Sequence, residues 1–276
     1  MDSGIATPTL GSSGWTTPMI ATSGYNTPVM GIESSIARLS LEPEPKQAFR
    51  FFDLPSELRS RIYELALVLS RTIDLDPTNS HRISPRLEIF LTCHRMHEEA
   101  YRVFYGQHTF RLFPIHGRFF HTNQPLLARL SPRYRAAVTT VELRLGPGWG
   151  KPPKCWNTSP RLGLADCSHL RQLKIFVEID PSDDIFRGFR VADNFYTVFS
   201  KDLVQQICEQ VPSLKEVQFD AYPAVQKSAP LVQELLAEVK GRGKKITWGP
   251  LRGWDEHSED AFGRIGLEDP MALMKL

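Results

Sequence analysis

Two side chains in the middle of the chain have the spacing of a metal-binding pair. Cys93 and His97 lie four residues apart, which would place a thiolate and an imidazole on one face of a helix. A structural zinc site needs four ligands, and no second Cys/His pair has matching spacing. Cys93 also falls on an apolar stripe with Met96 and Ala100. We therefore expect a buried core thiol at Cys93 and no metal site.

The other cysteines show no pattern that would activate a thiol. Cys155, Cys167 and Cys208 are widely spaced, and no CxxC pair occurs. No nearby base marks Cys155 or Cys167 as a nucleophile, and no Ser-His-Asp order, paired carboxylates or dinucleotide fingerprint stands out. We expect reduced thiols, no catalytic residue and no cofactor, so the chain is predicted not to be an enzyme.

A glycine-rich stretch at residues 146–151 follows a predicted strand, which is where a phosphate-binding loop would lie. It does not match GxxxxGK[ST], and Pro147, Pro152 and Pro153 remove amide donors that a phosphate cradle needs. The acidic run Asp180-x-x-Asp183-Asp184 is more typical of a turn or a helix cap than of a metal site. Neither stretch predicts a ligand.

The first 45 residues contain a ten-residue repeat, Gly-x-x-Thr-Pro, with its threonines at Thr7, Thr17 and Thr27. Gly, Ser, Thr and Pro dominate, and Asp2 is the single charge in the first thirty residues. Such a segment cannot bury enough apolar surface to offset its ordering entropy, so we expect disorder. The three Thr-Pro sites are phosphorylation candidates for proline-directed kinases, and the alternative is a neutral flexible tail.

After this segment, the chain has the pattern of a capped amphipathic helix that begins near Pro55. Proline suits the first helical position, and Glu57 falls in the first turn, where its charge meets the positive end of the helix dipole. Apolar residues then recur at steps of four, three and four and line one face. They are Leu58, Ile62, Leu65 and Leu69. The charged residues between them are expected to face water, and they are Arg59, Arg61 and Glu64.

A second helical pattern covers residues 89–106, with a short strand expected at residues 108–112. Its apolar face is spaced at four, three, four and three residues. The members of that face are Ile89, Cys93, Met96, Ala100 and Val103. Gly106 is placed to end the helix. Between the two helices, Pro77, Asn79 and Pro85 predict a turn-rich loop at residues 74–85.

The pairing of LPSELRSRIYELAL with LTCHRMHEEAYRVFYGQHTF resembles a class of filamentous-fungal F-box-like proteins, over residues 49–113. An F-box is a short helical module that docks a substrate receptor onto the adaptor of a cullin-type ubiquitin ligase. The resemblance implies an adaptor-binding surface made of Leu54, Pro55, Leu58, Ile62 and Leu65. The second helix departs from the Cys-Lys-x-Trp pattern of well-studied F-boxes, because residues 93–96 read Cys-His-Arg-Met.

Beyond residue 114, alternating apolar residues predict strands near 141–145, 173–179, 217–219 and 246–248. Helical patterns at residues 194–211 and 229–240 separate the later strands, which implies parallel pairing. Leu170-x-x-Leu173-x-Ile175 aligns with the LxxVxF run at residues 214–219, and a similar frame starts at Val138. This resembles the strand segment of a leucine-rich repeat, although the spacings of 32 and 44 residues are irregular and long.

The predicted fold class is therefore α/β. N-terminal F-box-like helices precede an irregular, mostly parallel, leucine-rich-repeat-like β/α array, and a disordered tail precedes both. The expected segments are a Thr-Pro repeat tail at 1–45, the helical module at 46–113, the β/α region at 114–250 and a C-terminal tail at 251–276. In the array, Leu173, Ile175 and Val177 should be buried together, with Lys174 outside and Phe176 facing the opposite way.

Charge and hydropathy exclude some functions. The net charge is +2, no apolar run is long enough to span a bilayer, and the N-terminus has no secretory h-region. From His81 to Leu145 there are ten Arg and four Glu, which we interpret as solvated faces and local ion pairs. We expect protein partners, namely a ligase adaptor and an unknown target, with no nucleic acid and no membrane, and an intracellular location in cytoplasm or nucleus.

Two functions remain open at this point. The chain is predicted to be a non-enzymatic interaction protein, a substrate receptor of a cullin-type ubiquitin ligase. The alternative is a structural scaffold in which the F-box-like helices pack internally and have no ligase role. Burial separates the two, because the scaffold requires Leu58, Ile62 and Leu65 to be covered by the chain's own residues.

Overall fold

A computed structural model describes residues 49–115, 117–181, 186, 188 and 194–255 of the 276-residue chain. From Arg50 onward, the described residues belong to one compact unit. The predicted disordered tail with Thr7, Thr17 and Thr27 lies outside the described residues, as do Asp183, Asp184 and residues 256–276.

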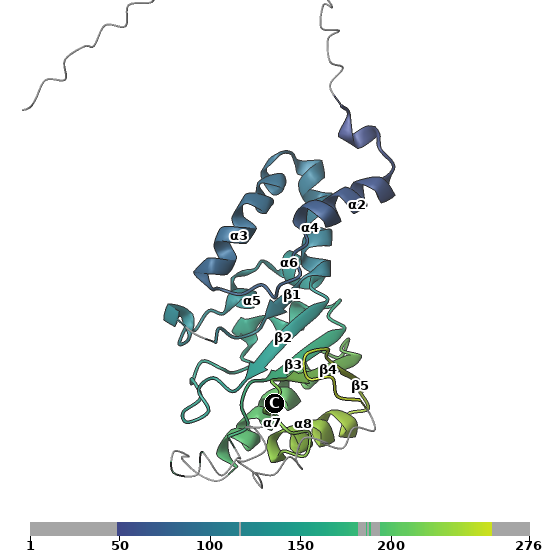
Figure 1. The fold of residues 1–276 in the computed structure, drawn as a ribbon. Coiled ribbons are helices and arrows are strands. Elements are labelled where there is room, and N and C mark those ends of the chain that lie inside the picture. The colour runs from purple at the N-terminus through teal and green to yellow at the C-terminus, as the bar shows by residue number, and fades with distance from the viewer. Residues whose placement is uncertain (1–48, 116, 182–185, 187, 189–193, 256–276) are drawn as a thin grey trace, which may run out of the picture. The chain divides into compact units, whose positions relative to one another are not determined.

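A five-stranded parallel sheet forms the centre of this unit, and its strands follow one another in sequence order (Figure 1). The strands are β1 (Thr109–Arg111), β2 (Thr140–Leu145), β3 (Gln172–Val177), β4 (Glu216–Ala221) and β5 (Lys245–Trp248). The predicted α/β class and the parallel pairing are confirmed. Strand β1 confirms the short strand expected at residues 108–112, and it pairs with β2, so the sheet begins before the expected boundary at residue 114.

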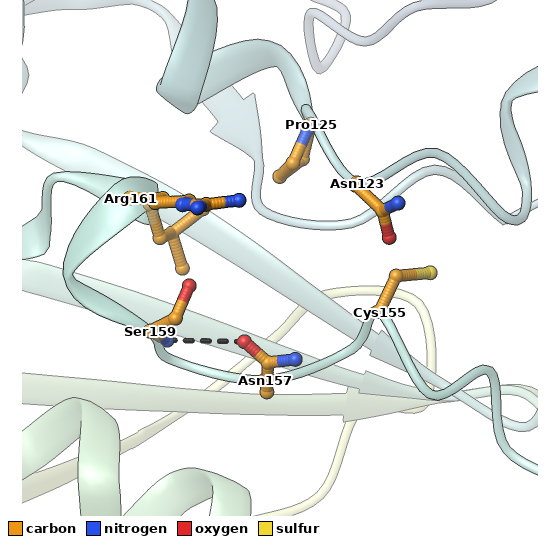
Figure 2. Close-up of a pocket in the computed structure, with 7 residues that line it drawn as sticks. Asn123, Pro125, Cys155, Asn157, Ser159 and Arg161 are labelled. Carbon is orange, nitrogen blue, oxygen red and sulfur yellow. Dashed lines mark hydrogen bonds between the residues drawn. The ribbon is translucent and has the colours of Figure 1, made fainter.

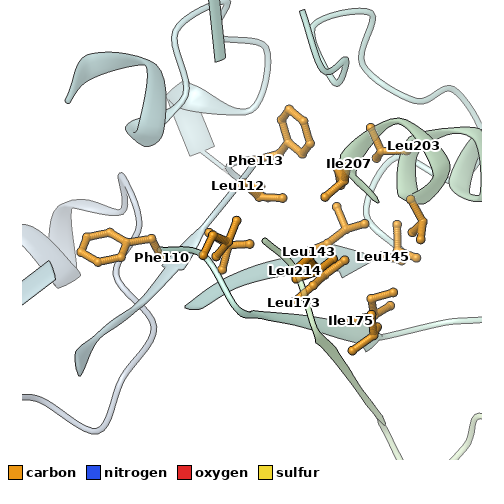
Figure 3. Close-up of a cluster of buried hydrophobic side chains, with 14 of the residues drawn as sticks. Phe110, Leu112, Phe113, Leu143, Leu145, Leu173, Ile175, Leu203, Ile207 and Leu214 are labelled. Atoms are coloured by element: carbon orange, nitrogen blue, oxygen red, sulfur yellow. The ribbon is translucent and has the colours of Figure 1, made fainter. Parts of the chain in front are cut away.

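One face of the sheet is apolar and packs against α7 (Phe195–Gln210) and α8 (Pro230–Gly241). In register, Leu173 pairs with Val141 on one side and with Val217 on the other. The next inward row is formed in the same way by Leu143, Ile175 and Phe219. Figure 3 shows Leu203 and Ile207 of α7 beside these strand side chains. The expected joint burial of Leu173, Ile175 and Val177 is confirmed, since none of the three is exposed.

Helices α2 (Ser56–Leu67) and α4 (His94–Gln107) pack against each other. Pro55 is the N-cap of α2, and the short 3-10 helix η2 (Phe51–Asp53) precedes it. The inward face of α2 consists of Arg59, Tyr63 and Leu67. The expectation that Arg59 faces water is wrong, because its guanidinium forms an ion pair with Glu99 of α4, 2.8 Å away.

Helix α4 starts later than the apolar spacing predicts. The 3-10 helix η3 (Glu88–Leu91) ends before it, and Cys93 is the extended N-cap residue, whose Sγ accepts the N–H of Met96 at 3.4 Å. Cys93 is therefore exposed, and the prediction of a buried core thiol is wrong. Gly106 does not end the helix, which continues to Gln107.

The predicted loop at residues 74–85 is also wrong, because residues 77–87 form helix α3 (Pro77–Leu87). Residues at its start cap the helix, and Pro85 lies inside it. The carbonyl of Asp76 accepts the N–H groups of Asn79 and Ser80, and Asp74 Oδ1 accepts the N–H of Asp76 at 3.0 Å. Proline at the start of a helix costs no hydrogen bond, so Pro77 opens the helix.

Short helices connect the larger elements. They are η4 (Gly117–Phe119), α5 (Leu126–Arg129), α6 (Pro132–Ala137), η5 (Pro160–Leu162) and η6 (Leu164–Asp166). After β5, Trp254 is 5% exposed and its ring packs edge-on against Trp248 of β5, at 5.9 Å between centroids. The first residues of the expected C-terminal tail therefore include part of the core.

Candidate interaction surfaces

The outward face of α2 is apolar and uncovered by the rest of the described chain. Leu58, Ile62 and Leu65 are 53%, 40% and 69% exposed, and their spacing of four and three places them on one face. Pro55 at the N-cap is also exposed, whereas Leu54 is half-buried. The residues that the F-box resemblance implies therefore form an apolar strip along α2, with Leu54 partly withdrawn from it.

The opposite face of α2 is held by packing and by a charged network. Tyr63 and Leu67 are 2% and 0% exposed. Glu99 accepts two hydrogen bonds from the Arg59 guanidinium, at 2.8 and 2.9 Å, and a third from the Tyr63 hydroxyl at 3.2 Å. Helix α2 cannot rotate to hide its outer leucines, because rotation would expose Leu67 and break this network.

Electrostatics keep each member of the network in the protonation state that it needs. The hydrogen bond from Arg59 holds the pKa of the Glu99 carboxyl below its usual value, so Glu99 stays ionised. Burial, reinforced by the nearby Glu99 charge, raises the pKa of Tyr63 to about 12, so its hydroxyl remains a donor. The network is therefore stable across the physiological range of pH.

The second surface is the sheet face that points away from α7 and α8. Its side chains are mostly polar and stand in rows set by the parallel register. One row runs Arg111, Glu142, Lys174, Gln218, Thr247. A neighbouring row is joined by hydrogen bonds, since Glu216 Oε1 accepts from Gln172 Nε2 at 3.1 Å and from Thr247 Oγ1 at 2.7 Å.

At the β1 side, this face deepens into a hollow of about 340 Å³ lined by residues of α3, β1, β2 and the segment before α3. Its buried charges, Arg111 and Glu142, are already paired. Arg111 contacts Glu142 at 3.0 Å and also forms an ion pair with Asp74, and Thr72 donates to Glu142. Among the described residues, no group of three or more His, Cys, Asp or Glu side chains could hold a metal ion.

At the carboxyl ends of β2, β3 and β4, the same face carries an aromatic cluster. The Arg144 guanidinium lies 4.5 Å from the centre of the Phe176 ring and donates to the Tyr222 hydroxyl at 2.7 Å. The rings of Phe176 and Tyr222 meet edge to face at 5.0 Å, and Glu178 forms an ion pair with Arg144. Arginine and aromatic side chains of this kind are enriched in protein interfaces.

Sequence reasoning placed Phe176 on this face but missed Arg144 and Tyr222. The signal was present for Arg144, which lies two residues beyond Glu142 on the same alternating strand and pairs in register with Phe176. Tyr222 directly follows β4, and only the tertiary fold brings it to Arg144.

Another hollow, of about 270 Å³, lies beside the loop that carries Cys155 (Figure 2). Asn123, Asn157 and Ser159 line it, and the Ser159 N–H donates to Asn157 Oδ1 at 3.2 Å. Burial raises the pKa of the Cys155 thiol, which disfavours the nucleophilic thiolate. None of the described residues lining this hollow is a histidine or a carboxylate that could act as a base.

The two other motifs singled out in the sequence have internal partners. Both ring nitrogens of His97 are engaged, with the Phe90 carbonyl at 3.1 Å and the Tyr134 hydroxyl at 2.8 Å, while Cys93 caps the helix. In the glycine-rich stretch, the Gly146 N–H donates to the Tyr196 hydroxyl at 2.7 Å. Neither arrangement leaves groups converging on an empty site.

Comparisons with protein-family models, with curated proteins and with solved structures found no match for this chain. In the part of the chain that the structure describes, no helix has the length and apolar character needed to span a lipid bilayer.

Proposed function

We propose that this chain is a non-enzymatic interaction protein whose helix α2 docks onto the adaptor of a cullin-type ubiquitin ligase. The observation that carries the proposal is the exposed strip formed by Leu58, Ile62 and Leu65. Anchors at positions i, i+4 and i+7 of an amphipathic helix are the pattern by which a helix enters an apolar groove on a partner.

The inner face of α2 supports the same role. Its contacts with Glu99, together with the burial of Tyr63 and Leu67, hold the helix in place before any partner arrives. A helix that is already ordered loses little conformational entropy on binding, so its exposed leucines contribute more of their burial to affinity.

We assign target binding to the open face of the sheet. Its half-buried polar rows are suited to hydrogen bonding with a protein surface, and the Arg144–Phe176–Tyr222 cluster provides an interface anchor. The chain would then present a target to the ligase without carrying out chemistry itself. The scaffold alternative requires Leu58, Ile62 and Leu65 to be covered, and the exposure of all three counts against it.

The test is direct binding to a purified adaptor subunit, measured by calorimetry. We expect the double variant Leu58→Asp, Leu65→Asp to weaken adaptor binding by about a hundredfold, since buried interface anchors contribute about 1–2 kcal/mol each. The control is Val198→Asp, which makes the same kind of substitution once, at an apolar residue that is 54% exposed on α7.

The control should bind as tightly as the unaltered protein, and all three proteins should melt at similar temperatures. If the unaltered chain does not bind the adaptor, or if the double variant binds equally well, the proposed ligase role is wrong.

A further inference from the structure

A hollow of about 440 Å³ lies between α4, α6 and the residues just before β2 and β3. It is separate from the outward face of α2 and from the open face of the sheet, and the proposed function does not use it. Three side chains that can carry a positive charge line it, namely Arg102, Arg133 and His169. None of the described residues in its lining is acidic.

Arg102 differs from several arginines of the basic window in that it has no acidic partner among the described residues. Arg95, Arg111, Arg133 and Arg144 each form an ion pair with a carboxylate. Arg102 is exposed and forms no ion pair within the described residues; its Nε donates to the Tyr101 hydroxyl at 3.4 Å. Most of its donor capacity therefore faces the hollow and solvent, and remains available to an anion.

Arg133 lies at the same site. Its guanidinium stands 4.6 Å from the centre of the Tyr101 ring and forms an ion pair with Glu98, which neutralises part of its charge. Hydrogen bonds from Arg102 and Arg133 lower the pKa of Tyr101, which reflects the positive potential there. His169 adds a third group: its Nδ1 lies 2.7 Å from the Ala136 carbonyl, so Nε2 is the nitrogen left for a ligand.

The floor of the hollow is small and apolar. Gly106 of α4 and Ala136 and Ala137 of α6 leave space where larger side chains would fill the gap between the two helices. A free phosphate ion would occupy only part of 440 Å³ and would leave this floor uncovered. The geometry therefore suits an anionic group attached to an apolar neighbour.

We propose that this hollow binds a phosphorylated serine or threonine side chain of a peptide. The phosphate, with a charge of about −1.5 to −2, would accept paired hydrogen bonds from Arg102 and Arg133. The residue that follows the phosphate would cover the floor at Ala136 and Ala137. A nucleic acid fits less well, because it needs an extended basic surface, and Arg95 and Arg135 nearby are neutralised by Glu99 and Asp166.

The test measures peptide binding to the full chain by fluorescence anisotropy. The probe is a separate labelled peptide, ATSGYNTPVM, which is the sequence of residues 21–30, with a phosphate on the threonine that corresponds to Thr27. We expect the phosphorylated peptide to bind at least about tenfold more tightly than the unphosphorylated one, because hydrogen bonds to charged groups are the strong ones. Arg102→Gln should remove most of that difference.

Two further variants separate the parts of the site. Arg82→Gln removes an exposed arginine of α3 that does not line the hollow, and it should bind the phosphopeptide normally. Ala137→Leu fills the floor but keeps both arginines, so it should weaken the phosphopeptide and leave competition by inorganic phosphate unchanged. Thermal melting of each variant checks that the fold is intact.

Several results would overturn the proposal. Equal binding of the two peptides would show that the hollow does not recognise the phosphate group. Normal phosphopeptide binding by a folded Arg102→Gln protein would show the same. Inorganic phosphate that binds as tightly as the phosphopeptide would make this a site for a free anion. A single-stranded oligonucleotide that binds more tightly, and is lost in Arg102→Gln, would make it a nucleic-acid site.

Discussion

The outward face of α2 and the open face of the sheet are both uncovered. They differ in whether their side chains already have bonding partners within the chain. Leu58, Ile62 and Leu65 each leave between 40% and 69% of their surface exposed to water. On the sheet, Arg111, Glu142 and their neighbours are joined by ion pairs and hydrogen bonds within the rows. The first surface is apolar area that a partner can bury, whereas the second is partly structural, because its polar groups already stabilise one another.

This difference has a practical consequence for mutagenesis. Substitutions on the outer strip of α2 should change binding and leave stability almost unaltered. Substitutions in the polar rows should change stability wherever they remove one partner of a buried pair.

The largest expected effect separates the two faces of α2. Leu67 is 0% exposed, so Leu67→Ala should lower the free energy of unfolding by about 3 kcal/mol, through lost burial and the cavity left behind. Leu65, two residues earlier and 69% exposed, should tolerate the same change within about 0.5 kcal/mol. Urea unfolding of the two variants measures this. Equal losses would mean that the strip is part of the core and is not a docking surface.

A smaller effect tests the sheet. Glu142→Ala removes a partner of Arg111 at a site that is 9% exposed, and we expect a loss of about 2 kcal/mol. Lys174 stands beside Glu142 in the same row and forms no ion pair with the described residues. Lys174→Ala should therefore cost less than about 0.5 kcal/mol. Urea unfolding measures both losses. If Glu142→Ala also costs less than about 0.5 kcal/mol, the ion pairs of this row do not stabilise the fold, and the two surfaces do not differ in this respect.

The smallest effect concerns pH. Because the folded-state pKa of Tyr63 is raised to about 12, its neutral hydroxyl stabilises the folded protein below the unfolded pKa, which is near 10. That contribution should disappear as the pH rises towards 12. Tyr63→Phe should cost about 1 kcal/mol at neutral pH, through the lost hydrogen bond to Glu99, and should lose less stability between pH 10 and 12. Denaturation curves recorded across that range decide the point. If the stability of the unaltered protein and of Tyr63→Phe falls equally between pH 10 and 12, ionisation of Tyr63 does not contribute to the pH dependence.

The strands could be predicted because their signal is local. Val141, Leu143 and Leu145 alternate with polar residues. This alternation indicates a strand with one buried face, whichever element packs against that face. The same holds for Leu58, Ile62 and Leu65, whose spacing alone places them on one face of α2. Leu69, expected on the same face, lies beyond the end of the helix and is half-buried. The parallel order also follows, because helical patterns separate the later strands.

The errors arose where a residue's role depends on a distant partner. Arg59 has the spacing of a solvent-facing residue, and its burial depends on Glu99, which lies forty residues away. The apolar period of α4 continues through Cys93, but the backbone there is extended and the helix begins one residue later. Pro77 and Asn79 are typical of turns and of helix starts alike, so composition did not separate a loop from α3.

The sequential strand order has a consequence for how the chain can fold and change. Each strand pairs only with strands adjacent in sequence, so the sheet can assemble one β/α unit at a time, as solenoid arrays do. Its β1 edge is closed, because the backbone of Ile73 exchanges hydrogen bonds with Thr109 and Arg111. In the described residues, β5 is the last strand at the other edge. During evolution, a β/α unit could therefore be added or lost beyond β5 without changing the pairing of the other strands. A new strand inserted before β1 would have to displace Ile73.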